Sequence, residues 1–269
     1  MPNSYVSPTG GASTQDGLSA DTAYAYSSLA SAESDAGDGG TILFLDGTYS
    51  FTGDKTWDSG GFADMTYKSL NDQGAYLFGT SIRRLTIGSA TTTTMKIEGF
   101  QQANIHWYGN ASTTFTINKI RHADTVSGTR GGLGIFVPLN SNANAITNSS
   151  FVIDYSSSDR LFHSAGGTSL TSCSFFLKCS SVSANGITSF GGSPSSSSNT
   201  IFMSDNSSAI DASVIDSSTC TNCCIFQMDS GDSSGGTNNV FADPQFVDAP
   251  NSDLRLRPGS PCINAGTSS

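Results

Sequence analysis

Three aspartates and a lysine occupy one recurring position in the second half of the chain. Asp154, Lys178, Asp205 and Asp229 each stand three residues after a phenylalanine. A glycosidase needs two carboxyl groups about 5–10 Å apart, and aspartates on adjacent coils of a solenoid would lie roughly 5 Å apart. Asp is also common where a strand ends in a turn. The turn interpretation is favoured, and these acids remain candidate catalytic residues.

Two further polar groups could do acid–base chemistry. Asp159, Arg160 and His163 place an acid, a cation and an imidazole within a few residues, close after Asp154. A surface turn would explain this cluster equally well. The segment 121–124, Arg-His-Ala-Asp, is a shorter group for which catalysis is a minor alternative. The whole chain contains three histidines, which is little material for a catalytic triad or a metal site.

The cysteines and one acidic loop are the other places where a metal could bind. Cys220, Cys223 and Cys224 have one ligand-like spacing, but a zinc site needs a second pair of ligands nearby. Cysteine is among the most buried residue types, so core filling is the expected role. Residues 229–238 are rich in oxygen donors but lack the spacing of an EF-hand. The sequence therefore predicts no metal and no cofactor.

The phenylalanines that precede the acids form a repeat. Phe151, Phe175, Phe202 and Phe226 follow one another at intervals of 24, 27 and 24 residues. Such a period is typical of units that bury a core only by stacking. If the phenylalanines point inward, strand alternation also directs the residues two before and two after them inward. These are Ser149, Cys173, Thr200 and Cys224, then Ile153, Leu177, Ser204 and Met228.

The opposite parity of the same strands gives an unusually apolar outer row. It contains Val152, Phe176 and Met203, where a solvated face should be polar. Exposed apolar patches mark interaction surfaces. The row is therefore predicted to be an interface, either within a homotrimer or with another protein of a virus particle.

The composition favours strands over helices. The repeats are rich in Ser, Thr, Asn, Gly and aromatic residues and show no helical leucine period. Short apolar segments bounded by turn residues read as strands; they are 41–45, 85–87, 115–117 and 135–137. We therefore predict an all-β solenoid in one domain, although the strand register over residues 51–140 is left open.

The two ends of the chain differ from the repeat. Residues 1–50 are predicted to form a cap, with a short helix over 23–34 and a first strand over 41–45. Residues 51–240 would form the coils. The period breaks after Phe226, since Phe241 follows it by 15 residues. Residues 241–269 are therefore predicted to be a closing segment.

Both ends carry a family resemblance. The opening Tyr5-Val-Ser-Pro-Thr-Gly, Asp16-Gly-Leu-Ser-Ala-Asp-Thr-Ala and Gly39-Gly-Thr-Ile-Leu-Phe-Leu-Asp-Gly-Thr-Tyr resembles that of right-handed parallel β-helix proteins of the pectin-lyase-like superfamily. The tail, with Asp243-Pro-Gln-Phe-Val-Asp and Leu254-Arg-Leu-Arg-Pro-Gly-Ser-Pro-Cys-Ile-Asn-Ala-Gly, is similar to one common in the same group. The resemblance implies a right-handed parallel β-helix. That architecture hosts lyases, glycosidases, tailspikes and adhesins, so it does not choose a function.

Charge and hydropathy exclude several partners. The net charge is −10, and charged residues make up only 13% of the chain. This balance argues against a nucleic-acid partner, which needs a basic footprint. No apolar run reaches a transmembrane length, so membrane insertion is not expected. No secretory signal is visible at the N-terminus, and a virion location is the associated expectation.

Three hypotheses for function follow. The favoured one is a non-enzymatic structural or host-attachment protein of a phage particle, such as a tail fibre, spike or decoration component. The second is a polysaccharide lyase or glycoside hydrolase that acts through the outer-face acids, although the aspartate pairs and basic motifs of those enzymes are missing from the sequence. The third is an adhesin that binds a cell-surface polysaccharide on aromatic residues of the first half. Its candidate ligand-binding residues are Trp57, Tyr67, Trp107 and Tyr108.

Overall fold

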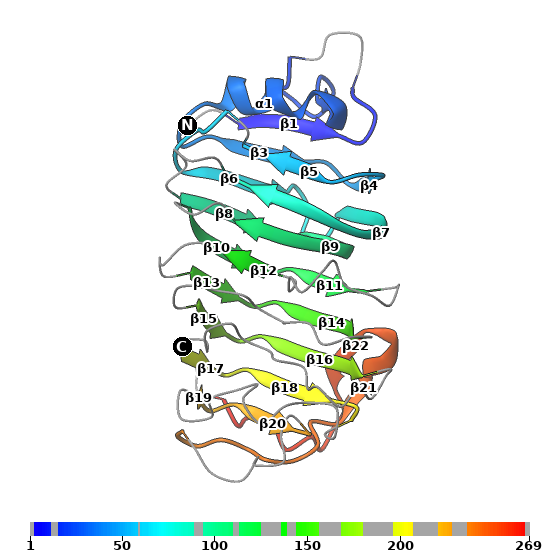
Figure 1. Ribbon diagram of the computed structural model, residues 1–269, viewed down its shortest axis with the longest axis vertical. Helices are drawn as coiled ribbons and strands as arrows, with labels where there is room; N and C mark the ends of the chain where they lie inside the picture. Colours follow the sequence, from blue (N-terminus) through cyan, green and yellow to red (C-terminus); the bar gives the residue numbers. More distant parts are fainter. Residues whose placement is uncertain are drawn as a thin grey trace.

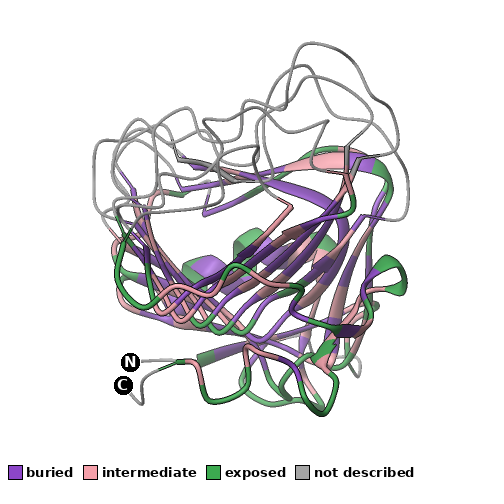
Figure 2. Cartoon of the chain, turned by 90° about the horizontal axis from the view of Figure 1, so that it is seen from below, coloured by how far each residue is buried: buried purple, intermediate pink, exposed green. Residues whose placement is uncertain are grey.

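The computed structural model describes an elongated stack of β-coils with a helical cap (Figure 1). The described residues are 3–11, 16–58, 60–88, 94–109, 113–124, 136–138, 144–155, 168–179, 196–206, 220–227 and 236–266. The strands stack along the long axis, and buried residues line the interior when the molecule is seen from below (Figure 2). No helix in this part of the chain is long and apolar enough to cross a membrane.

Two long parallel sheets form the walls of the stack. Neighbouring strands within each sheet pair in parallel and come from successive coils, so the chain winds as a β-helix. The first sheet contains, in spatial order, β2 (Tyr24–Ala25), β1 (Asn3–Ser7), β3 (Thr41–Phe44), β6 (Met65–Ser69), β8 (Thr94–Glu98), β10 (Thr114–Asn118), β13 (Asn144–Thr147), β15 (Thr168–Thr171), β17 (Ser196–Ser198) and β19 (Cys220–Thr221).

The second sheet runs beside the first. It contains β4 (Gly47–Phe51), β7 (Ala75–Ile87), β9 (Gln101–Gly109), β11 (Arg121–Ala123), β14 (Ser150–Tyr155), β16 (Ser174–Cys179), β18 (Ile201–Ser204) and β20 (Cys224–Phe226). Two short strands extend it: β5 (Lys55–Trp57) pairs with the end of β7, and β12 (Phe136–Pro138) pairs with the end of β9. The parallel pairing confirms the predicted all-β parallel β-helix.

A single left-handed residue turns the chain from the first sheet into the second in most coils. It carries a φ of 49 to 55° at Lys119, Asn148, Ser172, Asn199 and Asn222. Asn tolerates this conformation better than most residues, which explains the Asn that precedes Phe151, Phe202 and Phe226 by three or four residues. The inward position of the second sheet then falls three residues after the turn.

This spacing corrects the predicted register of the last coil. Phe151, Phe175 and Phe202 stack inward as predicted, with ring centroids 4.9 and 5.3 Å apart. The next residue of the column is Ile225, which pairs with Phe202, whereas Phe226 pairs with Met203 on the outer side. Asn222 is followed by two cysteines and then Ile225, so counting from the turn would have found the shift.

The same shift moves a cysteine. Cys223, not Cys224, continues the inner row of Cys173 and Thr200, and it is buried in the main core. Cys224 lies on the outer side of the wall, where its Sγ donates to the Ala242 carbonyl at 3.3 Å. All cysteines whose state is described are free thiols.

The N-terminal cap covers the first coil. After β2 a 3₁₀ turn, η1 (Tyr26–Ser28), leads into α1 (Leu29–Ala36). The helix therefore begins later than predicted, because residues 24–25 pair with β1 as a strand. Leu29, Ala32 and Ala36 face the core at helical spacing. The cap protects the open end of the solenoid.

The C-terminal segment packs on the outside of the lower coils (Figure 1). Strand β21 (Phe246–Asp248), the 3₁₀ turn η4 (Ala249–Asn251) and strand β22 (Asp253–Leu256) form an antiparallel hairpin. Phe246 and Ala249 form a second core with Val152 and Phe176, and Met203 packs against it. The hairpin thus explains the apolar outer row without a partner chain. The predicted use of Val152, Phe176 and Met203 as an intermolecular interface is wrong, because Val152 and Phe176 are buried within the chain.

Candidate functional site

A polar step interrupts the inner column of the second sheet. The column runs Tyr49, Leu77, Gln102, His122, Phe151, Phe175, Phe202, Ile225, each residue paired with the next across neighbouring strands. All members except Gln102 and His122 are apolar or aromatic. His122 and Gln102 are 1% and 2% exposed, so these two polar side chains need partners inside the core.

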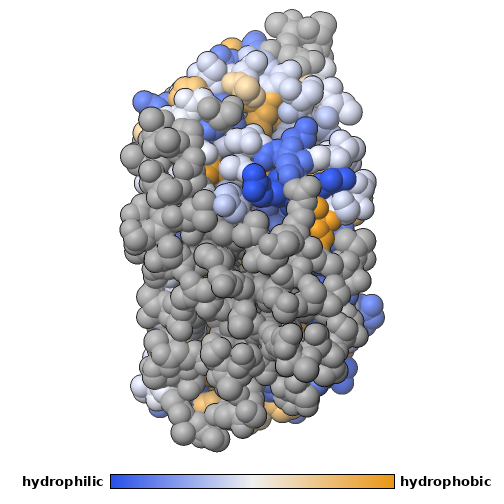
Figure 3. Space-filling model, viewed as in Figure 1, coloured by the Kyte–Doolittle hydropathy of each residue, from blue (hydrophilic) through white to orange (hydrophobic). Residues whose placement is uncertain are grey.

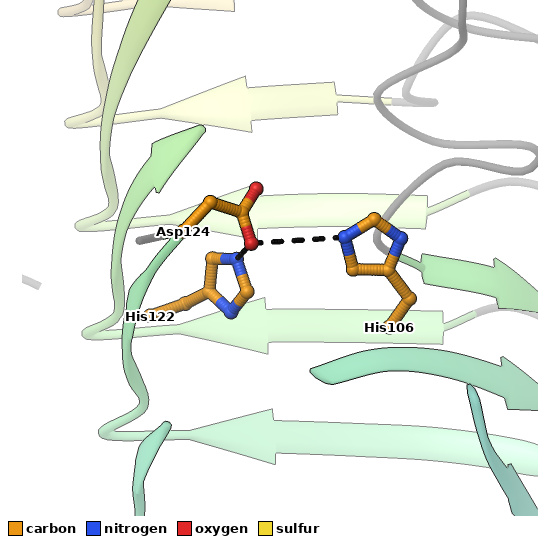
Figure 4. A group of neighbouring side chains, drawn as sticks. All are labelled: His106, His122 and Asp124. Carbon is orange, nitrogen blue, oxygen red and sulfur yellow. Dashed lines mark hydrogen bonds and ion pairs between the residues drawn. The ribbon is translucent and has the colours of Figure 1, made fainter. Parts of the chain in front are cut away.

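His122 and Asp124 lie two residues apart and point the same way, and His106 approaches from strand β9. The Nε2 atom of His122 lies 3.0 Å from Oδ1 of Asp124, and Nε2 of His106 lies 3.7 Å from the same oxygen. Asp124 sits between the two imidazole rings (Figure 4). All three side chains are buried. The site therefore joins residues that are distant along the chain but adjacent in successive coils.

A chain of hydrogen bonds sets the orientation of His122. The indole N–H of Trp107 donates to Oε1 of Gln102 at 2.7 Å. The amide nitrogen of Gln102 therefore faces Nδ1 of His122, 2.9 Å away, and donates to it. With Nδ1 accepting, the neutral ring carries its proton on Nε2 and donates it to Asp124.

Asp124 is the charged centre of this cluster. Burial by itself raises the pKa of the Asp124 carboxyl, but His122 and His106 outweigh that effect and hold the pKa below its ordinary value. Neither ring nitrogen of His106 has a hydrogen-bond partner within the described part of the chain. Among the described residues, the cluster thus combines a buried carboxylate with an imidazole whose ring nitrogens make no hydrogen bond.

His106 was not predicted as a site residue, and the 121–124 group was only a minor candidate. His122 stands three residues after the left-handed Lys119, and Gln102 three residues after the left-handed Gly99. This is the position that phenylalanine takes in the later coils, so the turn spacing was the signal for both. His106 has no such signal, because its approach to Asp124 depends on how β9 bends at Asn104.

A groove under the C-terminal hairpin is the second candidate site. It has a volume of about 500 Å³ and lies between strands β16, β18 and the hairpin. Its polar lining includes Asp205, Asp243, Asp248, Gln227, Gln245 and Arg257, and its apolar lining includes Phe176 and Met203. Arg257 is held in place, since its Nη2 donates to the Val247 carbonyl at 2.7 Å.

Two of the predicted acids, Asp154 and Asp205, lie among the described residues. Asp154 pairs in register with Lys178. Asp205 directly follows the next strand, β18, which ends at Ser204. Asp205 continues that row, since its N–H donates to the Leu177 carbonyl, and it lines the groove. Asp159, Arg160, His163 and Asp229 lie outside the described residues.

The proposed aromatic platform is wrong for three of its four residues. Trp57 and Tyr67 are fully buried and stacked on each other beneath the cap, with ring centroids 4.7 Å apart. Trp107 is 3% exposed and bonds to Gln102 inside the core. These three side chains occupy inward-facing positions of strands β5, β6 and β9. Tyr108 is half-buried, and the Arg84 guanidinium lies 4.6 Å from its ring centre.

One face of the molecule carries a group of polar side chains near the cap end. Figure 3 shows hydrophilic side chains gathered on the upper part of the view, with apolar spots scattered among them. Among described residues, the large exposed apolar side chains are Leu18, Leu70, Phe241 and Ile263.

The comparisons with known proteins bear on the fold. No protein-family model matches the chain, and no curated protein does. Among solved structures, the chain is similar to the pectin methylesterase PemA from Erwinia chrysanthemi, with a TM-score of 0.50 and 10% identity over 84% of this chain and 71% of that chain. It is also similar to the pectate lyase Pel9A, with a TM-score of 0.48 and 13% identity over 100% of this chain and 92% of that chain. The likeness is one of fold.

Proposed function

We propose that the protein is a non-enzymatic attachment β-helix of a virus particle and that the groove under its C-terminal hairpin binds a glycan. The observation that carries the proposal is the lining of this groove. Carboxylate groups accept hydrogen bonds from sugar hydroxyls, and amide groups both donate to and accept from them. Met203 and Val247, which are half-buried, supply apolar surface for the C–H faces of a sugar ring. An open groove on the side of a rod also suits a chain-like ligand.

The charge of the groove narrows the class of glycan. Among the described lining residues, Asp205, Asp243 and Asp248 stand against one guanidinium, that of Arg257. Like charges repel in such a site, so a neutral polysaccharide is favoured over a polyuronate. One structurally similar protein is a pectin methylesterase. Polygalacturonate, a polyuronate, is therefore a useful negative comparison in the binding test.

Glycan-array binding followed by calorimetry tests this proposal. We expect Asp205→Asn to weaken a neutral-glycan hit about tenfold, because a hydrogen bond to a charged group is lost. Asp72→Asn is a matched control, since Asp72 is an exposed acid paired with Lys119 away from the groove. Absence of any glycan binding, or equal weakening by the control, would contradict the groove assignment.

A second function, hydrolysis or elimination of a polysaccharide, is favoured by one observation. The groove gathers Asp205 with Asp243 and Asp248, and paired carboxyl groups are what glycoside hydrolysis requires. Release of reducing ends from a hit glycan, abolished by Asp205→Asn, would replace the attachment proposal. Binding of the glycan without turnover would support the attachment proposal.

The virion location and a homotrimeric assembly belong to the same proposal. Because the hairpin covers the apolar outer row, a trimer would need another surface. Light scattering gives the mass of the assembly, and antibody detection in purified particles tests the location. A monomer absent from particles would contradict both.

A further inference from the structure

We propose that His106, His122 and Asp124 bind a divalent transition-metal ion inside the solenoid. Two imidazoles and a carboxylate are the donor set that zinc and related ions prefer. Their ligand atoms all lie within 4.8 Å of one another. This inference is independent of the glycan groove, which lies farther along the stack under the hairpin.

The distances fit one shared ion. Ligand atoms at the usual 2.0–2.2 Å from a tetrahedral zinc are roughly 3.3 Å from each other. The observed separations are 3.0 Å from His122 and 3.7 Å from His106 to the carboxylate oxygen of Asp124. The His106 and His122 ring nitrogens lie within 4.8 Å of each other, and they would have to approach one another so that all three atoms reach bonding distance.

The buried polar groups that lack partners also favour a bound ion. The side chain of His106 is 8% exposed, and neither of its ring nitrogens has a hydrogen-bond partner within the described residues. Leaving a buried polar group without a partner is unfavourable. Asp124 is a buried carboxylate with no lysine or arginine bonded to it in the same part of the chain. A metal ion would satisfy the imidazole and neutralise the carboxylate together.

The surrounding residues would then respond. Nε2 of His122 can bind a metal only if its proton is on Nδ1 instead, so the ring changes tautomer without a net loss of protons. Nδ1 then carries a proton and faces the amide nitrogen of Gln102, 2.9 Å away. The Gln102 amide must therefore turn until Oε1, which now accepts from Trp107, accepts from Nδ1. Metal-binding histidines usually donate their other N–H to such an acceptor. Trp107 therefore reports on the site.

Titration of the purified, chelator-treated protein with Zn²⁺ and Co²⁺ tests the inference. We expect one equivalent to bind, the thermal midpoint to rise, and the visible Co²⁺ spectrum to show low, near-tetrahedral coordination. The tryptophan emission should change in the wild type and not in Trp107→Phe. Ca²⁺ and Mg²⁺ should have no effect, because they prefer all-oxygen sites.

Three variants make the outcome decisive. Asp124→Asn and His106→Ala should weaken Zn²⁺ binding at least about 100-fold, more than the loss of an outer-shell partner would. His163→Ala is the matched control, as it removes the third histidine of the chain and should keep full binding. His106→Ala removes a ring that makes no described hydrogen bond, so circular dichroism should show an intact fold. No Zn²⁺ or Co²⁺ binding by the wild type, unchanged binding in Asp124→Asn, or binding lost with His163 would overturn the proposal.

Discussion

Glu33 in the cap and Asp124 in the middle of the stack are both buried carboxyl groups, 2% and 5% exposed. Glu33 accepts from two neutral donors, the Asp58 N–H and the Tyr67 hydroxyl, each at 2.7 Å. Burial is the largest effect on Glu33 and raises its pKa. Asp124 faces two imidazoles, which lower its pKa despite its burial.

The difference shows that burial alone does not decide whether a carboxyl group in the core is protonated or ionised. A carboxyl group with neutral donors can become protonated and stay in the core as an ordinary hydrogen-bonding group. A carboxyl group among basic groups stays ionised and requires positive charge nearby. Glu33 therefore has the character of a structural residue, whereas Asp124 has that of a binding residue. Variants at the two places can test this contrast.

The largest expected effect is from His122→Phe, which extends the aromatic ladder by one step but removes the hydrogen-bond donor to Asp124. An uncompensated buried carboxylate should lower the free energy of unfolding by about 3–5 kcal/mol. The double variant His122→Phe, Asp124→Leu should recover most of the loss, since an apolar pair of similar volume replaces the polar one. Urea denaturation measures both. Equal instability of the single and double variants would show that the ladder geometry, and not the charge, is responsible.

The isosteric changes Asp124→Asn and Glu33→Gln should lower the free energy of unfolding by different amounts at neutral pH. Asp124→Asn is expected to lower the free energy of unfolding by about 2 kcal/mol, because a charge-assisted hydrogen bond is lost. Glu33→Gln should change it by less than about 1 kcal/mol, because the amide oxygen can still accept from the Asp58 N–H. Chemical denaturation compares the two, and a larger effect at Glu33 would reverse the contrast between the two acids.

The two acids should give pH profiles of opposite sign. The pKa of Asp124 lies below its ordinary 3.8, so its stabilising contribution is present above about pH 4 and is lost as the pH falls below that. The pKa of Glu33 lies above its ordinary 4.5, so its contribution is present below that value and is lost as the pH rises through the raised pKa. Each carboxyl group changes stability by at most about 1.4 kcal/mol per pH unit. Asp124→Asn should flatten the acid side of the profile, and Glu33→Gln the side above pH 4.5.

A small effect is also expected from Tyr67→Phe, the cap counterpart of removing His122. It deletes one donor to Glu33, and the carboxyl group can compensate by binding a proton. The loss should be about 1 kcal/mol, measured by thermal and urea unfolding. A loss as large as that of His122→Phe would mean that Glu33 is held as a charged group.

The regular part of the fold could be predicted because it depends on local rules. The inward direction of Phe151, Phe175 and Phe202 follows from strand alternation and similar coil length. The same rule failed at Phe226, because the last coil places one more residue between the left-handed Asn222 and the aromatic ring. Register depends on where the turn falls, and a repeated residue type is an indirect marker of it.

The candidate sites were harder to predict for a different reason. Trp57 and Trp107 are aromatic residues in an irregular stretch, and the sequence does not say which side of the wall they face. Val152 and Phe176 were correctly placed on the outer side, but the hairpin that covers them comes from the far end of the chain. A cover contributed by a distant segment leaves no local pattern.

The sequence by itself determined the parallel β-helix, its capped start, its separate closing segment and the dry phenylalanine ladder, because these follow from alternation, composition and period. The tertiary structure alone decided that His106 meets His122 and Asp124, that the hairpin buries the apolar row, and that Asp205 faces a groove. Stacking of coils brings together residues that are far apart along the chain, and their contacts depend on turn positions and strand bends that no short stretch of sequence encodes.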